Sequence, residues 1–294
     1  MKLVKQSLLA AYYYTQLPLR RVRGAVRAAR GQAPIMVLFY HRVADSQPND
    51  WTIPTARFAE QIDWLAHQFD LISLAEVHRR LRAGRNVRPA VCITFDDGYA
   101  DNCDFALPLL LEKQIPATYF VTLANVTTGV PFPHDLAAGA PLPPNTLDEL
   151  RSLASDGVEI GAHTRMHADL GKITDREELV DELLTSRDEL AAAIARPVRY
   201  FAFPYGQPQN MTEAAFALAR QAGLAGVCSA YGGYNFPGGD AFHLQRIHGD
   251  PETLRLKNWL SLDPRKARLH PDIVAANGWL PSESLPDNVC EAAL

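Results

Sequence analysis

The chain lacks several features that would place it in a class at once. Its four cysteines, Cys92, Cys103, Cys228 and Cys290, show no paired spacing, which mildly favours a cytoplasmic location over a disulfide-stabilised export product. Its formal net charge is only −4 over 294 residues, so there is no general case for nucleic-acid binding. What remains is an ordinary globular composition with 47% hydrophobic residues, enough for a sizeable core.

Acidic residues are absent from the first 44 positions, which carry eight lysines or arginines. The rest of the chain holds 21 basic and 33 acidic residues, a net charge of −12, so a basic arm precedes an acidic body. The apolar patch SLLAAYYYTQLPL (7–19) within this arm is too short and too polar to span a membrane. We expect residues 1–32 to form an amphipathic helix that makes peripheral contact with an anionic membrane surface. A helix packed on the body is the alternative, and a weak export signal is left open.

Short apolar runs alternate with helical patterns along the body. Strands are predicted at 35–41, 91–95, 117–122, 158–163, 198–203, 225–230 and 243–248. Helices are predicted at 55–69, at 102–114 with a kink at Pro108, and at 174–194, with capping pairs Ser73–Glu76, Thr146–Glu149 and Thr174–Glu177. The alternation predicts an α/β fold, a distorted (β/α) barrel with about seven strands. We expect three regions: the arm at 1–34, the barrel at 35–262 and a C-terminal extension at 263–294.

Polar side chains gather where the predicted strands end. The strand ends carry Tyr40-His41, Asp96-Asp97, His163, Pro204-Tyr205 and His248. A barrel places its chemistry at the carboxyl ends of its strands, so these residues are the candidate site. The segment 125–145, rich in proline and glycine, is expected to be a lid or rim loop. Its His134-Asp135 pair is interpreted as exposed, with substrate contact as the alternative.

Two motifs at those strand ends suggest a metal. If the chain turns helical after the strand at 158–163, His163 and His167 lie on one face, and two histidines with one carboxylate suit a first-row divalent ion. Asp96 and Asp97 are consecutive, so they point to opposite sides of a strand, and one can ligate while the other acts as a base. The alternatives are a chance HxxxH spacing and an aspartate pair that caps the turn before Gly98.

The motifs TFDDG (94–98), HTRMH (163–167) and FPYG (203–206), in this order and at these separations, resemble those of the NodB-type polysaccharide deacetylases, the family 4 carbohydrate esterases. FYHRV (39–43) with the helix after it resembles the exopolysaccharide-deacetylase branch. The resemblance covers roughly residues 35–250. It implies a hydrolase that removes acetyl groups from N-acetylated amino sugars of a polysaccharide or glycoconjugate. It also implies one divalent metal ion, usually Zn²⁺, and a carbohydrate partner.

The resemblance implies a role for each matching residue. Asp96 matches the general base, Asp97, His163 and His167 match the metal ligands, and His248 matches the late general acid, with His243 as a competitor. Pro204, Tyr205 and Gly206 match the groove wall, where the Tyr205 N–H would help to bind the oxyanion. His41 is a candidate substrate contact, with a buried structural histidine as the alternative.

The chain departs from the family pattern at two places. Ala202 stands where the family commonly carries an arginine that orients the base. Arg246 and His248 are two residues apart and share a strand face, so we predict that Arg246 points to Asp96 and takes that role; an ion pair with an acid at the rim is the alternative. No clear match to the family's tryptophan motif follows FPYG.

Two other functions compete with the N-deacetylase. One is an esterase acting on O-acetyl groups, which the same site would serve. The other is a non-catalytic carbohydrate-binding relative. The intact set of Asp96, Asp97, His163 and His167 argues against the second, because a binding module does not need a base beside a metal.

Overall fold

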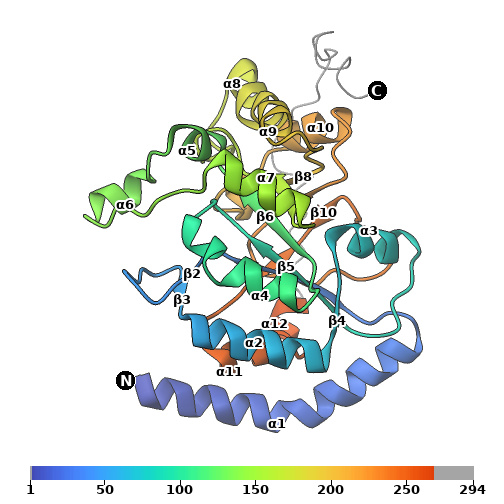
Figure 1. The fold of residues 1–294 in the computed structure, drawn as a ribbon. Helices are drawn as coiled ribbons and strands as arrows, with labels where there is room; N and C mark the ends of the chain where they lie inside the picture. The colour runs from blue at the N-terminus through green and yellow to red at the C-terminus, as the bar shows by residue number, and fades with distance from the viewer. Residues whose placement is uncertain (1, 268–294) are drawn as a thin grey trace.

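A parallel sheet that curls into a nearly closed barrel forms the centre of the computed structural model, which describes residues 2–267 (Figure 1). The strands of this sheet are β1 (Ile35–Tyr40), β4 (Asp70–Leu71), β5 (Ala90–Phe95), β6 (Ala117–Val121), β7 (Glu159–Ala162), β8 (Tyr200–Ala202), β9 (Gly226–Cys228), β10 (His243–Leu244) and β11 (Arg246–His248). A separate pair consists of β2 (Arg42–Val43) and β3 (Thr52–Ile53). The predicted (β/α) barrel is confirmed.

Barrel closure depends on the last strand segment. The sheet order is β10-β9-β8-β7-β6-β5-β1-β11, and β4 pairs with the start of β5. β10 pairs with β9, whereas β11 pairs with β1, so residues 243–248 join the two ends of the sheet. The segment splits at Gln245 because the Asn235 side chain accepts a hydrogen bond from the Gln245 N–H and donates one to its carbonyl. The path therefore counts eight strands where about seven were predicted.

Helices surround the barrel and fill the connections between its strands (Figure 1). The helices are α1 (Lys2–Ala29), α2 (Thr55–Gln68), α3 (Leu74–Arg82), α4 (Ala106–Glu112), α5 (Leu123–Thr128), α6 (Pro133–Ala137), α7 (Leu147–Ser155), α8 (Arg176–Val180), α9 (Ser186–Ile194), α10 (Glu213–Gln221), α11 (Thr253–Trp259) and α12 (Pro264–Ala267). The short turns η1 (Ala100–Cys103) and η3 (Pro208–Asn210) are 3₁₀, and the π-helical η2 (Asp181–Thr185) joins α8 to α9.

Several local predictions can be compared with these elements. The Thr146–Glu149 capping box is present, and the Ser73 side chain accepts from the Glu76 N–H. The Thr174–Glu177 pair was wrong: the cap of α8 is Asp175, whose side chain accepts from the Glu178 N–H. Pro108 produces no kink, because it lies in the first turn of α4, where its missing N–H is not needed.

The expected lid loop at 125–145 was also partly wrong. The end of α5 and all of α6 lie within it, so part of the segment is helical. Both helices stand at the same side of the barrel as the β2–β3 pair (Figure 1).

Side-chain alternation along the strands separates two apolar layers. One face of the strands packs under the surrounding helices, with Leu38 and Phe95 among its buried residues. The other face fills the barrel interior, where Phe120 and Ala202 belong to one buried cluster. Gly161 in β7 is required there, since a Cβ at this position would lie 2.3 Å from the Phe120 ring.

The predicted N-terminal helix is present as α1, which runs along one edge of the molecule beside α2 and α11 (Figure 1). It packs on the body through Arg20, which is 3% exposed and contacts residues 258–263. The expected C-terminal extension begins within this packed region, and residues 268–294 lie outside the described residues. No helix within residues 2–267 is long and apolar enough to cross a membrane.

Candidate active site

Strained backbone concentrates at the ends of β5, β7 and β8. Asp97, Thr164, His167 and Tyr205 all have positive φ, at 75°, 63°, 58° and 61°. Non-glycine residues in this region cost about 1–2 kcal/mol each, so the surrounding structure must hold them there. The condition of a helical turn over 163–167 is not met. A bend with two left-handed residues brings the rings of His163 and His167 together instead, with centroids 5.0 Å apart.

Asp97, His163 and His167 form a cluster suited to a metal ion. One ligand atom from each lies within 4.8 Å of the others. The Asp97 Oδ1 atom is 3.5 Å from His163 Nε2 and 3.3 Å from His167 Nε2, and it is buried without a hydrogen-bond donor of ordinary geometry. Two tetrahedral zinc ligands with bonds of about 2.1 Å lie about 3.4 Å apart, which agrees with these separations. The donor set therefore fits a divalent cation.

Within the cluster, the Asp97 carboxylate and the imidazoles stabilise each other's charged forms. Burial opposes the ionised form of Asp97, but the facing imidazoles outweigh it and hold the pKa of Asp97 well below its usual value. Burial likewise opposes a charged His167, but the Asp97 carboxylate raises the pKa of that histidine.

Neighbouring groups fix the direction of the two histidines. His163 Nδ1 lies 2.8 Å from the Ala202 carbonyl, so the proton on Nδ1 is donated there and Nε2 faces the cluster with its lone pair. Behind His167, the N–H groups of Arg165 and Met166 donate to Glu182 at 2.9 and 3.0 Å. Glu182 belongs to η2, and sequence analysis missed it, because a π segment leaves no signal in a pattern of helical period.

Asp96 points away from the cluster and binds Arg246. The guanidinium donates to both carboxylate oxygens, at 2.6 and 2.9 Å, and to the Thr94 hydroxyl at 3.2 Å. Arg246 is fully buried, with the rings of Phe39 and Phe120 at 4.9 and 5.4 Å. Burial opposes its charge, but Asp96 outweighs burial and raises the pKa of Arg246. The contact expected from sequence is therefore made, while the orienting role stays a prediction.

One cavity of about 540 Å³ gathers most of the candidate residues. It is lined by Phe39, His41, Trp51, Asp96, Asp97, His134, His163, His167, Phe203, Tyr205, Gln207, Ala230 and His248. Pro204, Gly206 and Arg246 are not part of this lining. His243 is not part of it either and packs against the rings of Phe216 and Tyr231, so His248 is the better placed of the two histidines. In the described part of the chain, the Tyr205 N–H makes no hydrogen bond.

Two further histidines of the cavity, His41 and His248, are held neutral. Burial lowers the pKa of His248 to about 4, and burial also lowers the pKa of His41. Their rings lie 6.2 Å apart. The site thus contains two neutral imidazoles at the carboxyl ends of β1 and β11.

Sequence analysis missed one aromatic wall of this cavity. Trp51, in the connection between β2 and β3, is 49% exposed, and its ring lies 4.8 Å from that of His41 and 6.1 Å from that of His248. An exposed tryptophan beside polar groups suits stacking on a sugar ring. No tryptophan motif follows FPYG. Instead, the loop between β2 and β3, which precedes FPYG in the chain, places a tryptophan at the cavity.

The interpretation of the His134-Asp135 pair as exposed was wrong for one of its members. Asp135 is 4% exposed and accepts a hydrogen bond from the Tyr99 hydroxyl at 3.0 Å. His134 lines the cavity, and its Nε2 lies 3.0 Å from the same hydroxyl. The pair therefore ties α6 to the rim of the site.

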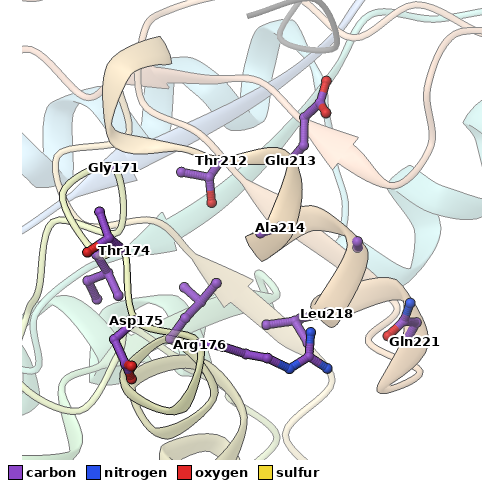
Figure 2. A pocket seen from close by; sticks show the side chains of 12 residues that line it. Gly171, Thr174, Asp175, Arg176, Thr212, Glu213, Ala214, Leu218 and Gln221 are labelled. Carbon is purple, nitrogen blue, oxygen red and sulfur yellow. The ribbon is translucent and has the colours of Figure 1, made fainter. Parts of the chain in front are cut away.

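A second cavity of about 270 Å³ lies between the loop before α8 and helix α10 (Figure 2). Leu179 and Leu218 form part of its apolar lining. Two of its polar side chains are used as helix caps, since Asp175 accepts from the Glu178 N–H and Thr212 accepts from the Ala215 N–H. No histidine or cysteine lines it, so it lacks the imidazoles that accompany the carboxylates of the first cavity.

At the strand ends of this parallel barrel, an aspartate and two histidines that could hold a metal ion lie beside a second aspartate that is bound by an arginine, and together they form a candidate hydrolytic site. Comparison with known families gives the narrower assignment. Residues 83–227, just under half of the chain, match the model of the polysaccharide deacetylase family. This match includes the motifs that carry Asp96, Asp97, His163 and His167.

Two curated sequences, one of them named as a putative polysaccharide deacetylase, are similar to the chain. YxkH of Bacillus subtilis (strain 168) is 26% identical over 183 residues, which cover 61% of this chain and 60% of YxkH. The chitooligosaccharide deacetylase of Bradyrhizobium sp. (strain ANU 289) is 29% identical over 140 residues, or 47% of this chain and 54% of that enzyme. The chain thus matches little more than half of the length of these relatives.

Solved structures share the fold. The deacetylase PplD of Streptococcus pyogenes, in complex with acetate, has a TM-score of 0.65 at 20% identity, covering 79% of this chain and all of that one (100%). IcaB from Ammonifex degensii also has a TM-score of 0.65, at 24% identity over 78% of this chain and 97% of that one. A de-N-acetylase from Aggregatibacter actinomycetemcomitans has a TM-score of 0.63 at 24% identity, and the match covers 77% of this chain and 99% of that one.

Proposed function

We propose that the protein is a metal-dependent hydrolase that removes acetyl groups from N-acetylated amino sugars and releases acetate. The observation that carries the proposal is the division of two adjacent carboxylates. Asp97 faces His163 and His167 with a buried oxygen that lacks a donor, whereas Asp96 is held by Arg246 in the same cavity. Such a pair supplies a cation site and a separate base.

Asp97, His163 and His167 would hold the metal, most simply Zn²⁺. When bound, a divalent ion there would polarise the acetyl carbonyl and make a water molecule more acidic. Asp96 accepts the proton of that water, because Arg246 occupies both of its oxygens from one side and fixes the carboxylate at the cavity wall. The Tyr205 N–H, which has no acceptor in the described part of the chain, donates to the oxygen that becomes negative.

His248 donates a proton to the leaving amine. Since burial lowers its pKa to about 4, the imidazole is neutral before the reaction at neutral pH. It therefore acts as an acid only after it takes up a proton within the cycle, and the proton that Asp96 removes from water is the available one. Trp51 and His41 lie beside His248 and would contact the sugar rings.

Metal analysis combined with two variants tests the separate roles. The purified protein is expected to hold about one divalent ion per chain. His163→Ala should lose the metal and the activity, whereas Asp96→Asn should keep the metal and lose acetate release by roughly 10²–10⁴-fold. His67→Ala, an exposed histidine on α2, is the matched control and should change neither. Full acetate release by Asp96→Asn would show that Asp96 is not the base.

The nature of the acyl bond needs a separate measurement. Acetate release from N-acetylglucosamine oligomers, peptidoglycan and lipid-linked amino sugars is compared with release from O-acetylated sugars. The proposal expects turnover of the amide. The relatives named as a chitooligosaccharide deacetylase and a de-N-acetylase support this expectation. Turnover of esters alone would make the protein an O-acetyl esterase. Sugar binding without any turnover would leave only a carbohydrate-binding role.

A further inference from the structure

Helix α1 presents an apolar stripe to solvent on the side turned away from the body. Val4, Leu8, Leu19, Val22 and Val26 are exposed by 63%, 66%, 48%, 63% and 45%. Their spacing, completed by the exposed Ala11 and Thr15, follows steps of three and four residues, which places all seven on one side of a helix. The stripe runs over most of the length of the helix, Lys2–Ala29.

The opposite side of α1 is already occupied. Tyr13 and Arg20 are 8% and 3% exposed, and they are seven residues apart on the face opposite the stripe. The Arg20 guanidinium donates to the Asn258 side chain and the Ser261 hydroxyl, both at 2.9 Å. The Tyr12 hydroxyl donates to Asp263 at 3.4 Å. The helix is therefore fixed in rotation, and packing on the body does not cover the stripe.

Positive charge flanks the stripe. Lys5, Arg23 and Arg30 are exposed and lie along one margin of it, and Arg21 lies on the other side. Within the described residues, these four side chains make no ion pair with a carboxylate. No acidic residue occurs before Asp45, whereas the rest of the chain has a net charge of −12. An anionic surface would attract this one face and repel the remainder of the protein.

We infer that the outward stripe of α1 binds the surface of an anionic lipid membrane, with α1 lying in the plane of the interface. This inference is separate from the proposed deacetylation, since none of the stripe residues lines the catalytic cavity. Aliphatic side chains enter the boundary of the acyl chains, and the flanking cations bind lipid phosphates. Pro18 interrupts the hydrogen bonding of the helix at an exposed position and allows α1 to bend, as Figure 1 shows near its middle.

Vesicle flotation with the full chain tests the inference. The protein should float with vesicles of phosphatidylcholine containing phosphatidylglycerol, and not with phosphatidylcholine alone. High salt should weaken the binding, because it screens the cationic margin. Val22→Glu should reduce the partition coefficient roughly tenfold, and Leu8→Glu/Val22→Glu should reduce it further.

The matched control is Val130→Glu, which changes a valine of similar exposure, 53%, between α5 and α6 on a different side of the molecule (Figure 1). It should float like the wild type, and all variants should share its melting temperature. Equal flotation of wild type and the double variant would overturn the inference, as would absence of flotation by the wild type. A dimer in sedimentation analysis that the double variant abolishes would instead assign the stripe to a second copy of the chain, and would also overturn it.

Discussion

Asp96 is 2% exposed, and an isolated ionised carboxylate would be expensive to bury at that depth. Arg246 compensates with two charge-assisted hydrogen bonds from a planar fork, which fixes the carboxylate in distance and in orientation. The Arg246 Nε–H is itself anchored on the Ser229 carbonyl at 2.8 Å. Ala202, at the position where the family commonly carries an arginine, is fully buried in the same interior.

Substitutions of Arg246 are expected to distinguish the effect of its positive charge from the effect of its two-pronged contact with Asp96. Arg246→Lys keeps the charge but loses the two-pronged contact, so kcat should fall by roughly 10–100-fold with the metal content unchanged. Arg246→Ala leaves Asp96 without its partner and should also lower the free energy of unfolding by about 3–5 kcal/mol. The readouts are kcat, bound metal and the melting temperature.

A second arginine position provides the control. If Arg246 acts by holding Asp96, the double variant Ala202→Arg/Arg246→Ala should regain part of kcat, because a guanidinium from β8 would reach the same interior. A role confined to stability would restore the melting temperature without restoring kcat. Unchanged kcat in Arg246→Lys would contradict the orienting role.

Residues inside short contiguous motifs were predictable, whereas residues brought in by distant loops were not. Asp96 and Asp97 are adjacent on a strand, so their opposite directions follow from local geometry. Trp51 lines the cavity from the loop after β2. Glu182, in the π segment η2, accepts from the Arg165 N–H beside His167. Neither residue lies at a fixed distance along the sequence from one of the motifs. Their contribution depends on tertiary packing, which no local pattern records.

Helix α3 packs on the barrel through a histidine that is held neutral. His78 is 4% exposed, its ring stacks on Tyr200 at 5.4 Å, and Gly226 in β9 permits the contact, since a Cβ there would lie 2.5 Å from the imidazole. Burial lowers the pKa of His78 from 6.5 to about 4. The contact between this helix and the sheet is therefore expected to depend on pH.

Acidification is expected to weaken this contact. The folded-state pKa is the lower one, so the unfolded chain binds more protons between pH 6.5 and 4, and stability falls as the pH falls through that window. At pH 5 the loss from this group amounts to about 2 kcal/mol relative to neutral pH. His78→Phe should remove that part of the acid sensitivity. Urea unfolding at pH 7 and pH 5 measures it, and His67→Phe, at an exposed position, is the control. An identical pH dependence in His78→Phe would contradict the assignment.

Element types were easier to predict than element ends. The pattern over 174–194 correctly predicted a helix, because its apolar positions recur with helical period. It did not show that α8 begins after Asp175 or that η2 adopts π geometry, since neither changes the hydrophobic period. The bend over 163–167 was missed because the left-handed states of Thr164 and His167 are imposed from outside, by contacts such as those of Glu182.

At the scale of the whole molecule, α1 and the segment around α11 and α12 hold each other. Arg20, Asn258 and Asp263 form a buried polar network, in which the Asn258 side chain donates to Asp263 at 2.8 Å. Arg20→Met should leave acceptors without donors and lower the free energy of unfolding by about 2–3 kcal/mol. Arg23→Met, exposed on the same helix, should have little effect. Thermal unfolding and limited proteolysis of α1 are the measurements, and equal behaviour of the two variants would show that α1 is not part of the cooperative unit.

The overall barrel was predictable because each strand and helix has a recognisable local sequence pattern, and because parallel strands require crossover connections. The way in which the barrel closes was not. Residues 243–248 form one apolar-polar run in the sequence, but Asn235 divides it so that β10 and β11 pair with opposite ends of the sheet.

That closing strand has a consequence for the time at which the protein becomes active during its synthesis. Arg246 and His248 lie on β11, and the bond from Arg246 to Asp96 spans 150 positions of the chain. A ribosome that has released every residue up to β9 has produced Asp96, Asp97, His163 and His167, but neither Arg246, which binds Asp96, nor His248, the proposed acid. If the proposed function is correct, a nascent chain that ends at β9 is expected to lack deacetylase activity, because Arg246 and His248 have not yet been added.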